Sequence, residues 1–436
     1  MQRILLMAAL LLPFTAQADD SLAAALQASR LSGYGKIMFV ADDKKGGRLN
    51  QNTPGFGGRL GIETGDYYGF SFKGALYTTQ DLGLRSDNPR KTDAYMFDLD
   101  KTPYSLPGEA QLGFASGKTT LTLGRQAFFS PIINSYEYRI IPNLFEAYTL
   151  KNKDLPHTTL TLAHVGKMSG LDGLVTYSEF RSMSQQTYTS LITNAAGAVD
   201  TGNGETLDPS RVVGHRGVWV AGLAFEPGDR LQLWNFHGAD TLNTLYVDGG
   251  LKQGLSENLT MTLEAQAYHV SAVGRFKQYL AQLGLNASYG LGGIKATLAY
   301  PPAGLSVSLA HNRFSGNERT VTAFGNWGGY PEFVSMPYLF AEKDGASAIA
   351  RSRLSKLTAL LDLGIYGLPD HALILGHARV DTDQAILANT DIIVNSLVYR
   401  ARLGHGWSAR AAFESRNSGN KRYDNEFLAL SARYDF

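Results

Sequence analysis

The sequence predicts an all-β protein, a closed antiparallel β-barrel that crosses a membrane with about 18 strands. Three observations lead to this prediction. Apolar and polar side chains alternate in many segments of about ten residues. The composition is rich in turn formers and aromatic residues, with 47 Gly, 22 Tyr and 21 Phe. Finally, the first residues have the pattern of an export signal.

The alternation is clearest near Phe436. Every second residue from Leu428 to Phe436 is apolar, and Arg433 and Asp435 lie between them. Successive side chains of a strand point to opposite faces, so this strand has one apolar and one polar face. The same period occurs in residues 59–63, 70–77, 259–268 and 305–312. Each of these segments is therefore predicted to be a strand of the same kind.

A membrane barrel explains these strands better than a soluble β-sandwich. A sandwich chain of this length would usually divide into smaller domains, but no linker or change of composition divides this sequence. A closed barrel in lipid has an apolar outside, a polar lumen and no free edges. Counting the segments gives roughly 16 to 20 strands, and a barrel of that size encloses a water-filled channel. Trp219, Trp234 and Trp407 would then belong to aromatic girdles or, alternatively, to the core.

Residues 1–18 have the order of a secretory signal peptide. Arg3 precedes an apolar run from Ile4 to Phe14, and the small-residue site Ala16-Gln17-Ala18 follows. The run is about half as long as a membrane-spanning helix, so cleavage after Ala18 is expected, with an uncleaved anchor as the alternative. Residues 19–30 would form a short periplasmic segment and residues 31–436 the barrel.

Composition excludes several classes of protein. No later segment is apolar over the length of a spanning helix, which excludes a helical membrane protein. The chain has no Cys, so disulfides and thiolate metal sites are absent. Its formal net charge of +1 argues against a nucleic-acid partner. We expect no cofactor and no resident metal.

The connections between strands predict an orientation, because outer-membrane barrels have short periplasmic turns and long outer loops. The tight segments "GLGG" after Tyr289 and "HGW" after Gly404 are predicted periplasmic turns. Residues 181–211 and 315–348 are predicted long outer loops. Within the first, "DTGNGETLD" is an oxygen-rich segment that fits either a calcium loop or, more simply, a solvated glycine-rich loop.

A third connection, from Phe128 to Leu144, is predicted to fold into the lumen and narrow it. The segment lacks a strand period and carries Ile132, Ile133, Ile140 and Ile141, which an outer loop would expose to water. Its predicted polar tip comprises Ser135, Tyr136, Glu137, Tyr138 and Arg139. Glu137 would either face a basic wall across the pore or pair with Arg139.

Residues 107–172 resemble the OprD family of outer-membrane porins. The resemblance rests on Gly124-Arg125-Gln126, Pro131, Arg139, Pro142 and the run "FEAYTL" from Phe145 to Leu150. It implies an 18-stranded channel of the bacterial outer membrane, a third loop folded inward, and a ladder of basic residues that guides small carboxylated nutrients. The Tyr-Glu-Tyr run between Ser135 and Arg139 is bulkier than the family pattern, which leaves pore size and charge preference open.

The strand period can be used to look for such a ladder independently. Apolar neighbours set the inward face, and on that face cations outnumber acids near the two ends of the sequence, which meet where a barrel closes. Guanidinium forks bind carboxylates well, so these residues are predicted to line the pore and bind substrate. The alternative is simple pairing with inward acids such as Glu414 and Asp435. The candidates are Lys36, Arg59, Lys73, Arg139, Arg400, Arg402, Arg410, Arg416 and Arg433.

The predicted function is passive, substrate-selective diffusion of organic acids, amino acids or peptides that carry a carboxylate. A general non-specific porin is the nearest alternative, and a barrel enzyme or adhesin is further away, because no serine lies in a glycine elbow and no histidine is paired with a nucleophile by spacing. The expected partners are outer-membrane lipid, lipopolysaccharide and the solute, with the chain a monomer or a loose trimer.

Overall fold

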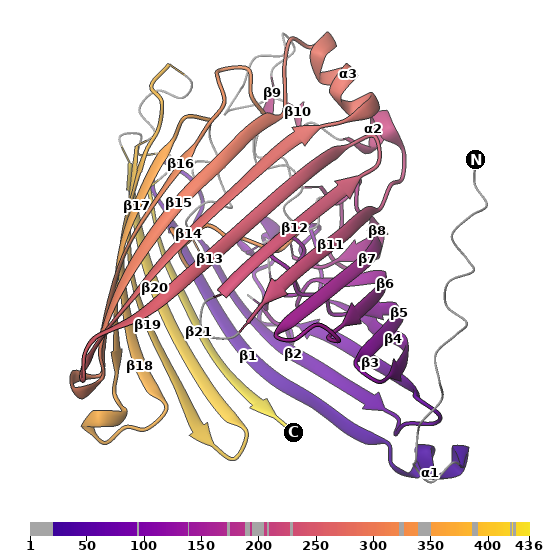
Figure 1. Ribbon diagram of the computed structural model, residues 1–436. Coiled ribbons are helices and arrows are strands. Elements are labelled where there is room, and N and C mark those ends of the chain that lie inside the picture. The colour runs from indigo at the N-terminus through magenta and orange to yellow at the C-terminus, as the bar shows by residue number, and fades with distance from the viewer. Residues whose placement is uncertain are drawn as a thin grey trace.

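The computed structural model is a single antiparallel barrel (Figure 1). It describes residues 21–93, 96–137, 139–171, 175–187, 192–193, 205–206, 209–226, 230–321, 327–338, 350–385, 391–418, 421 and 424–436. The predicted signal peptide and its cleavage site lie outside these residues and stay predictions.

Eighteen strands close the barrel, as predicted. The first half of the ring contains β1 (Arg30–Lys44), β2 (Gln51–Glu63), β3 (Phe70–Gln80), β4 (Tyr104–Ser116), β5 (Thr119–Gln126), β6 (Leu144–Asn152), β7 (Thr158–Ser169), β11 (Val218–Phe225) and β12 (Arg230–Gly238). The second half contains β13 (Leu242–Ser256), β14 (Leu259–Ala272), β15 (Ser288–Tyr300), β16 (Leu305–Phe314), β17 (Arg353–Asp362), β18 (His371–Asp381), β19 (Ile392–Gly404), β20 (Trp407–Ser418) and β21 (Asn425–Asp435). Short strands β8 (Arg181–Ser182), β9 (Ile192–Thr193) and β10 (Glu205–Thr206) lie in a loop.

The ring closes where β1 pairs with both β2 and β21. The register places Lys36 opposite Arg433 and Tyr34 opposite Asp435. Phe436 and Gly33 exchange two backbone hydrogen bonds of 3.0 and 3.1 Å. The predicted meeting of the two sequence ends is therefore confirmed, and it brings their cations onto one wall.

The helices are short. Among the described residues they are α1 (Leu22–Gln27), α2 (Ser210–Val213) and α3 (Gly274–Gln282), with 3₁₀ turns at Pro89–Lys91, Pro301–Ala303 and Gly364–Tyr366. Ser21 caps α1, because its Oγ accepts a hydrogen bond from Ala24 N at 3.0 Å. None of the helices in the described part of the chain is long and apolar enough to cross a membrane.

The two faces of the wall follow the predicted alternation. On β14 and β16, Leu263 and Leu309 lie on the exposed outer face, whereas Gln266 and Asn312 are buried on the inner face. An apolar outside is stable here because lipid, not water, covers it. Trp219 and Trp407 are exposed on the outside, as the girdle alternative predicts. Trp234 is buried and donates a hydrogen bond to Gln232, so the core alternative holds for this residue.

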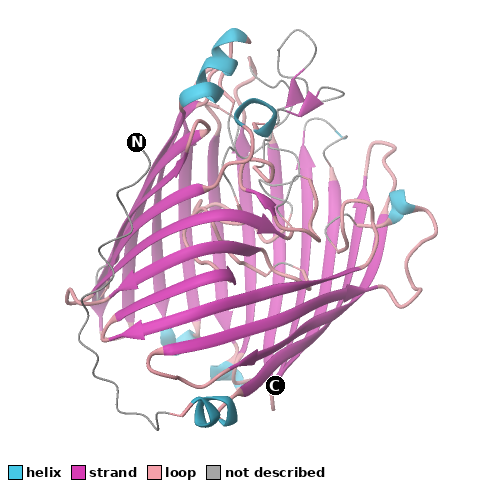
Figure 2. Cartoon of the chain, turned by 90° about the vertical axis from the view of Figure 1, so that its right-hand side faces the viewer, coloured by secondary structure: helices cyan, strands magenta, loops and turns pink. Residues whose placement is uncertain are grey.

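Short turns gather at the end of the barrel that holds α1 and Asp435, and long connections gather at the other end (Figures 1 and 2). The predicted turn at residues 405–406 is confirmed. The predicted turn at Gly290–Gly293 is wrong, because these residues lie within β15 and pair with β14 on one side and β16 on the other. Glycines tolerate a strand interior when both neighbours supply the ladder, so a glycine cluster alone did not mark a turn.

Candidate functional site

The lumen is narrowed by residues 127–137 and 139–143, which follow β5 and fold into the barrel. Gln126 ends the strand and donates from Nε2 to the carbonyl of Ala147 at 2.9 Å. The four isoleucines of this loop, which an outer loop would expose to water, are all buried. Inward folding of the third long-side loop is therefore confirmed. Its cause is the apolar surface that the four side chains would otherwise expose to water.

A second loop enters the lumen and packs against the first. Residues 327–338 belong to the connection that was predicted to be a long outer loop, and this part of the prediction was wrong. Trp327 accepts a backbone hydrogen bond from Asn134 at 2.9 Å and donates one to Ile132 at 3.1 Å. The constriction is thus made of two segments that are separated in the sequence by residues 144–326.

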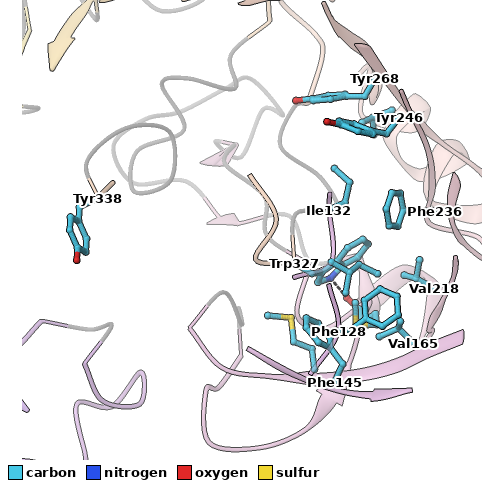
Figure 3. Packing of buried hydrophobic residues seen from close by; sticks show 14 of the residues in the cluster. Phe128, Ile132, Phe145, Val165, Val218, Phe236, Tyr246, Tyr268, Trp327 and Tyr338 are labelled. Atoms are coloured by element: carbon cyan, nitrogen blue, oxygen red, sulfur yellow. Dashed lines mark hydrogen bonds between the residues drawn. The ribbon is translucent and has the colours of Figure 1, made fainter. Parts of the chain in front are cut away.

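Trp327 lies at the centre of this contact. Its side chain is 2% exposed, and its indole Nε1 donates to the carbonyl of Met183 at 3.1 Å. Figure 3 shows the ring beside Phe128 and Ile132, close to the wall residues Phe145 and Val165. Three connections, at residues 127–143, 175–187 and 327–338, therefore meet at one side chain.

The tip of the first loop carries a carboxylate that reaches the barrel wall. Glu137 accepts a hydrogen bond from Lys36 at 2.8 Å and pairs with Arg433 at 2.6 Å. Neither predicted position of Glu137 is right: it does not face the basic wall across the pore, and it does not pair with Arg139. We call this contact the Glu137 clamp, formed by Glu137, Lys36 and Arg433.

The other tip residues have different positions. Tyr136 is exposed, whereas Ser135 is buried and accepts a hydrogen bond from Phe128 N at 3.0 Å. Tyr138 lies outside the described residues. Arg139, predicted to line the pore, is only 4% exposed; it lies 3.7 Å from Asp93 and over the rings of Tyr338 and Phe427. The alternation of side chains applies only to strands, so it could not predict that Arg139, in a loop, is buried against the wall.

The predicted basic residues of β19 to β21 do gather on one wall. A cavity of about 560 Å³ is lined by Lys36, Arg400, Arg402, Arg410 and Arg433. Arg400 and Arg402 are exposed to it and make no ion pair or side-chain hydrogen bond with any described residue. Arg410 donates to the hydroxyl of Tyr338, and Arg433 stacks on the ring of Tyr34 at 3.8 Å. Asp362 and Asp370 also line this cavity, but neither they nor any other described acid pairs with Arg400 or Arg402.

Arg433 also pairs with an acid of its own strand, as the alternative to a basic ladder predicted for this residue. Asp435 pairs with it at 2.6 Å. Arg416 and Glu414, both predicted to face water, point inward but are buried, and Glu414 accepts a hydrogen bond from Tyr338 N at 3.1 Å. Glu414 therefore lies against the second loop, and neither of these two residues is on the open pore surface.

Arg59 and Lys73 form a separate group on β2 to β4. Both lie 3.1 Å from the carboxylate of Glu109, which also accepts a hydrogen bond from Tyr77 at 2.5 Å. Glu109 was not identified from the sequence, because a proline-glycine pair and a register shift beside it obscure the strand period. The shared carboxylate reduces the attraction of this part of the ladder for an anion.

The opposite wall carries charged pairs that the sequence analysis did not single out. Arg230 pairs with Asp248 at 2.7 Å, and Lys295 pairs with Glu264 at 2.6 Å. These residues line a cavity of about 550 Å³ together with Tyr136 and Phe333. Glu264 was recognisable as inward from the period of β14. The described part of the lumen is therefore asymmetric, with two arginines that lack a described acidic partner on one side and neutralised pairs on the other.

Glu332 gives the second loop a pH-sensitive contact. Tyr268 donates its hydroxyl to Glu332 Oε1 at 2.8 Å, whereas Oε2 is buried without a hydrogen-bond partner among the described residues. Burial raises the pKa of this carboxyl above its usual range, although the Tyr268 hydroxyl and the backbone amide oppose the shift. The docked loop therefore favours the protonated carboxyl.

We expect docking of the second loop to weaken as pH rises. A raised pKa in the docked state means that the stabilisation is complete at low pH and is lost as pH rises through the raised pKa. Single-channel conductance and its noise should increase over that range. Glu332→Gln should remove this pH dependence while the Tyr268 contact persists; a variant with the wild-type pH profile would show that another group titrates.

No group of three or more acidic or histidine side chains that could hold a metal occurs in the described part of the chain. Most of the segment considered as a calcium loop lies outside the described residues, so that alternative stays untested.

The closed 18-stranded wall, its apolar outside and a polar lumen narrowed by inward loops define an outer-membrane channel. The family model for outer membrane porins of the OprD family matches residues 100–399. The chain therefore belongs to the OprD family and is a substrate-specific channel of the bacterial outer membrane, not an enzyme. The predictions of family, fold and location are confirmed.

Solved structures support the fold. OccK9 (OpdG) of Pseudomonas aeruginosa has a TM-score of 0.71 at 13% identity, covering 95% of this chain and 99% of its own. OccAB1 of Acinetobacter baumannii has a TM-score of 0.70 at 14% identity, with coverages of 96% and 99%. P. aeruginosa OpdK, solved with vanillate, has a TM-score of 0.68 at 12% identity, with coverages of 94% and 99%. The comparison with curated proteins found no match.

Proposed function

We propose that the channel conducts small solutes that carry a carboxylate, and that Arg400 and Arg402 are their principal contacts. The observation that carries the proposal is the exposure of both guanidinium groups to one cavity without an acidic partner in the described chain. A guanidinium group can bind a carboxylate with paired, charge-assisted hydrogen bonds. OpdK, a structural neighbour, was solved with vanillate, which is such a carboxylate.

The rest of the predicted ladder would act around these two residues. Arg410 and Arg433 line the same cavity, so a carboxylate could pass between neighbouring cations. Their existing contacts with Tyr338 and Glu137 would keep each binding step weak, which passage through a channel requires. Arg59 and Lys73 would contribute less because they share Glu109.

The test is planar-bilayer conductance in dilute salt, titrated with aromatic and aliphatic carboxylates and then with uncharged analogues. We expect concentration-dependent block by carboxylates, weakened about tenfold, or ~1.4 kcal/mol, in Arg400→Ala with Arg402→Ala. Replacing both residues with Lys should recover part of the effect, since the charge remains but the paired hydrogen bonds do not.

A matched control removes two arginines that lie on the outer face, Arg313 and Arg379. This double alanine variant should keep the wild-type block. Conductance that is indifferent to every carboxylate, in the wild type as in the variants, would contradict the proposal and favour a non-specific pore.

A further inference from the structure

Two arginines on the outer face of the barrel lie side by side without an acidic partner among the described residues. Arg313 of β16 and Arg353 of β17 are directly opposite each other in the register, at the end of the barrel where the long connections lie. Both are exposed, on the same face as Leu309 and Leu357. Neither makes an ion pair or side-chain hydrogen bond with any described residue. Like charges opposite each other destabilise a sheet unless an anion lies between them.

The neighbouring acids are already engaged. Asp381 is opposite Arg353 in the register, but its carboxylate pairs with Arg379 at 2.6 Å. Glu318 and Asp383 pair with Arg351 at 3.4 and 3.3 Å. None of these three acids pairs with Arg313 or Arg353, so both guanidinium groups keep their positive charge in the described part of the rim.

The surface beside the two arginines is hollowed. Gly292 lies next to Arg313 in the register, and a side chain at this position would project into open space. Gly290, Gly292 and the two arginines line a hollow of about 820 Å³. The missing side chains leave room for a bulky group against the guanidinium groups.

Further along β15 and β16 the surface becomes an apolar groove, which extends from there over β14, β13 and β12. Ile294 and Leu309 lie at its edge, and the small residues Gly249, Ala265 and Ala296 form part of its lining. The groove has a volume of about 1020 Å³. A cationic hollow above an apolar groove matches an amphipathic molecule with an anionic head and hydrocarbon chains, but not a soluble anion.

We propose that this surface binds one molecule of lipopolysaccharide. A phosphate of its lipid A head contacts Arg313 and Arg353, and acyl chains occupy the groove beside Ala296. The position supports this partner, because the long-loop rim of an outer-membrane barrel faces the outer leaflet, whose lipid carries phosphorylated sugars. Arginine pairs bind phosphate through several short hydrogen bonds.

The test is native mass spectrometry of the full-length barrel in detergent, titrated with lipid A that carries two phosphates. We expect Arg313→Gln with Arg353→Gln to weaken binding at least about tenfold. The matched control is Arg216→Gln with Arg275→Gln, two rim arginines that lie 3.9 and 3.2 Å from Asp240, and it should bind as the wild type does.

Two further measurements distinguish the contribution of the lipid A phosphates to binding from that of the acyl chains. Lipid A without phosphates should bind the wild type about tenfold more weakly. Ala296→Trp, which places an indole in the groove, should weaken binding of lipid A without changing any binding of inorganic phosphate. Equal lipid A affinity in the wild type and the Arg313/Arg353 variant would overturn the proposal, as would inorganic phosphate binding these arginines as tightly as lipid A does.

Discussion

Trp327→Ala is expected to widen the channel and to make its conductance noisy. The indole is buried where three inward connections meet, and truncation of a buried tryptophan costs roughly 3–5 kcal/mol through lost contacts and the cavity left behind. Docking of residues 327–338 depends on this side chain and on backbone bonds to Ile132 and Asn134. Since the strand ladder does not involve Trp327, the barrel itself should persist.

Single-channel recording provides the measurement, with heat-modifiable electrophoretic mobility as the check that the barrel is closed. Trp219→Ala is the matched control, because Trp219 is 60% exposed on the outer face and touches neither loop tip. A Trp327→Ala channel with wild-type conductance and noise would show that the second loop does not depend on this contact.

Glu137→Gln is expected to increase block by carboxylates about tenfold to a hundredfold, or ~1.4–2.7 kcal/mol. The Glu137 clamp places a protein carboxylate on Lys36 and Arg433, which line the same cavity as Arg400 and Arg402. An amide neutralises neither cation, so both become available to a solute. The loop should also lose part of its anchoring, because removing one member of a partly buried ion pair destabilises the contact.

Titration of conductance with a carboxylate, in Glu137→Gln and in Glu137→Asp, would separate charge from anchoring. The aspartate keeps the charge but has a shorter reach, so it should loosen the loop without the full gain in affinity. Glu146→Gln is the matched control, since Glu146 pairs with Arg125 and Lys167 away from this cavity. Unchanged or weaker block in Glu137→Gln would show that solutes do not use Lys36 and Arg433.

The strand period predicted the wall well because it is a local property. The side a strand residue faces depends only on parity relative to its neighbours. Arg400, Arg402, Arg410 and Arg433 could therefore be assigned to the lumen from short segments. The turn predicted at Gly290–Gly293 was wrong because it relied on a glycine cluster, and these glycines continue a strand. Strand parity had no meaning for Arg139, which lies in a loop.

The pairing of the charges could not be predicted in this way. Glu137 lies 101 positions from Lys36 and 296 positions from Arg433, and only closure of the ring and inward folding of the loop bring the three together. The same holds for the docking of Trp327 on Ile132. No local pattern distinguishes a neutralised lumen cation from one that is free for a solute.

The sequence by itself thus determined the class of fold, the outer and inner faces of most strands, the inward third loop and the family, because each follows from local periodicity, apolar content or a short motif. Only the tertiary structure decided which cations remain unpaired, that a second loop narrows the pore, and where the outer face is hollowed. These features depend on contacts between segments far apart in the chain, and such contacts form only when the barrel closes.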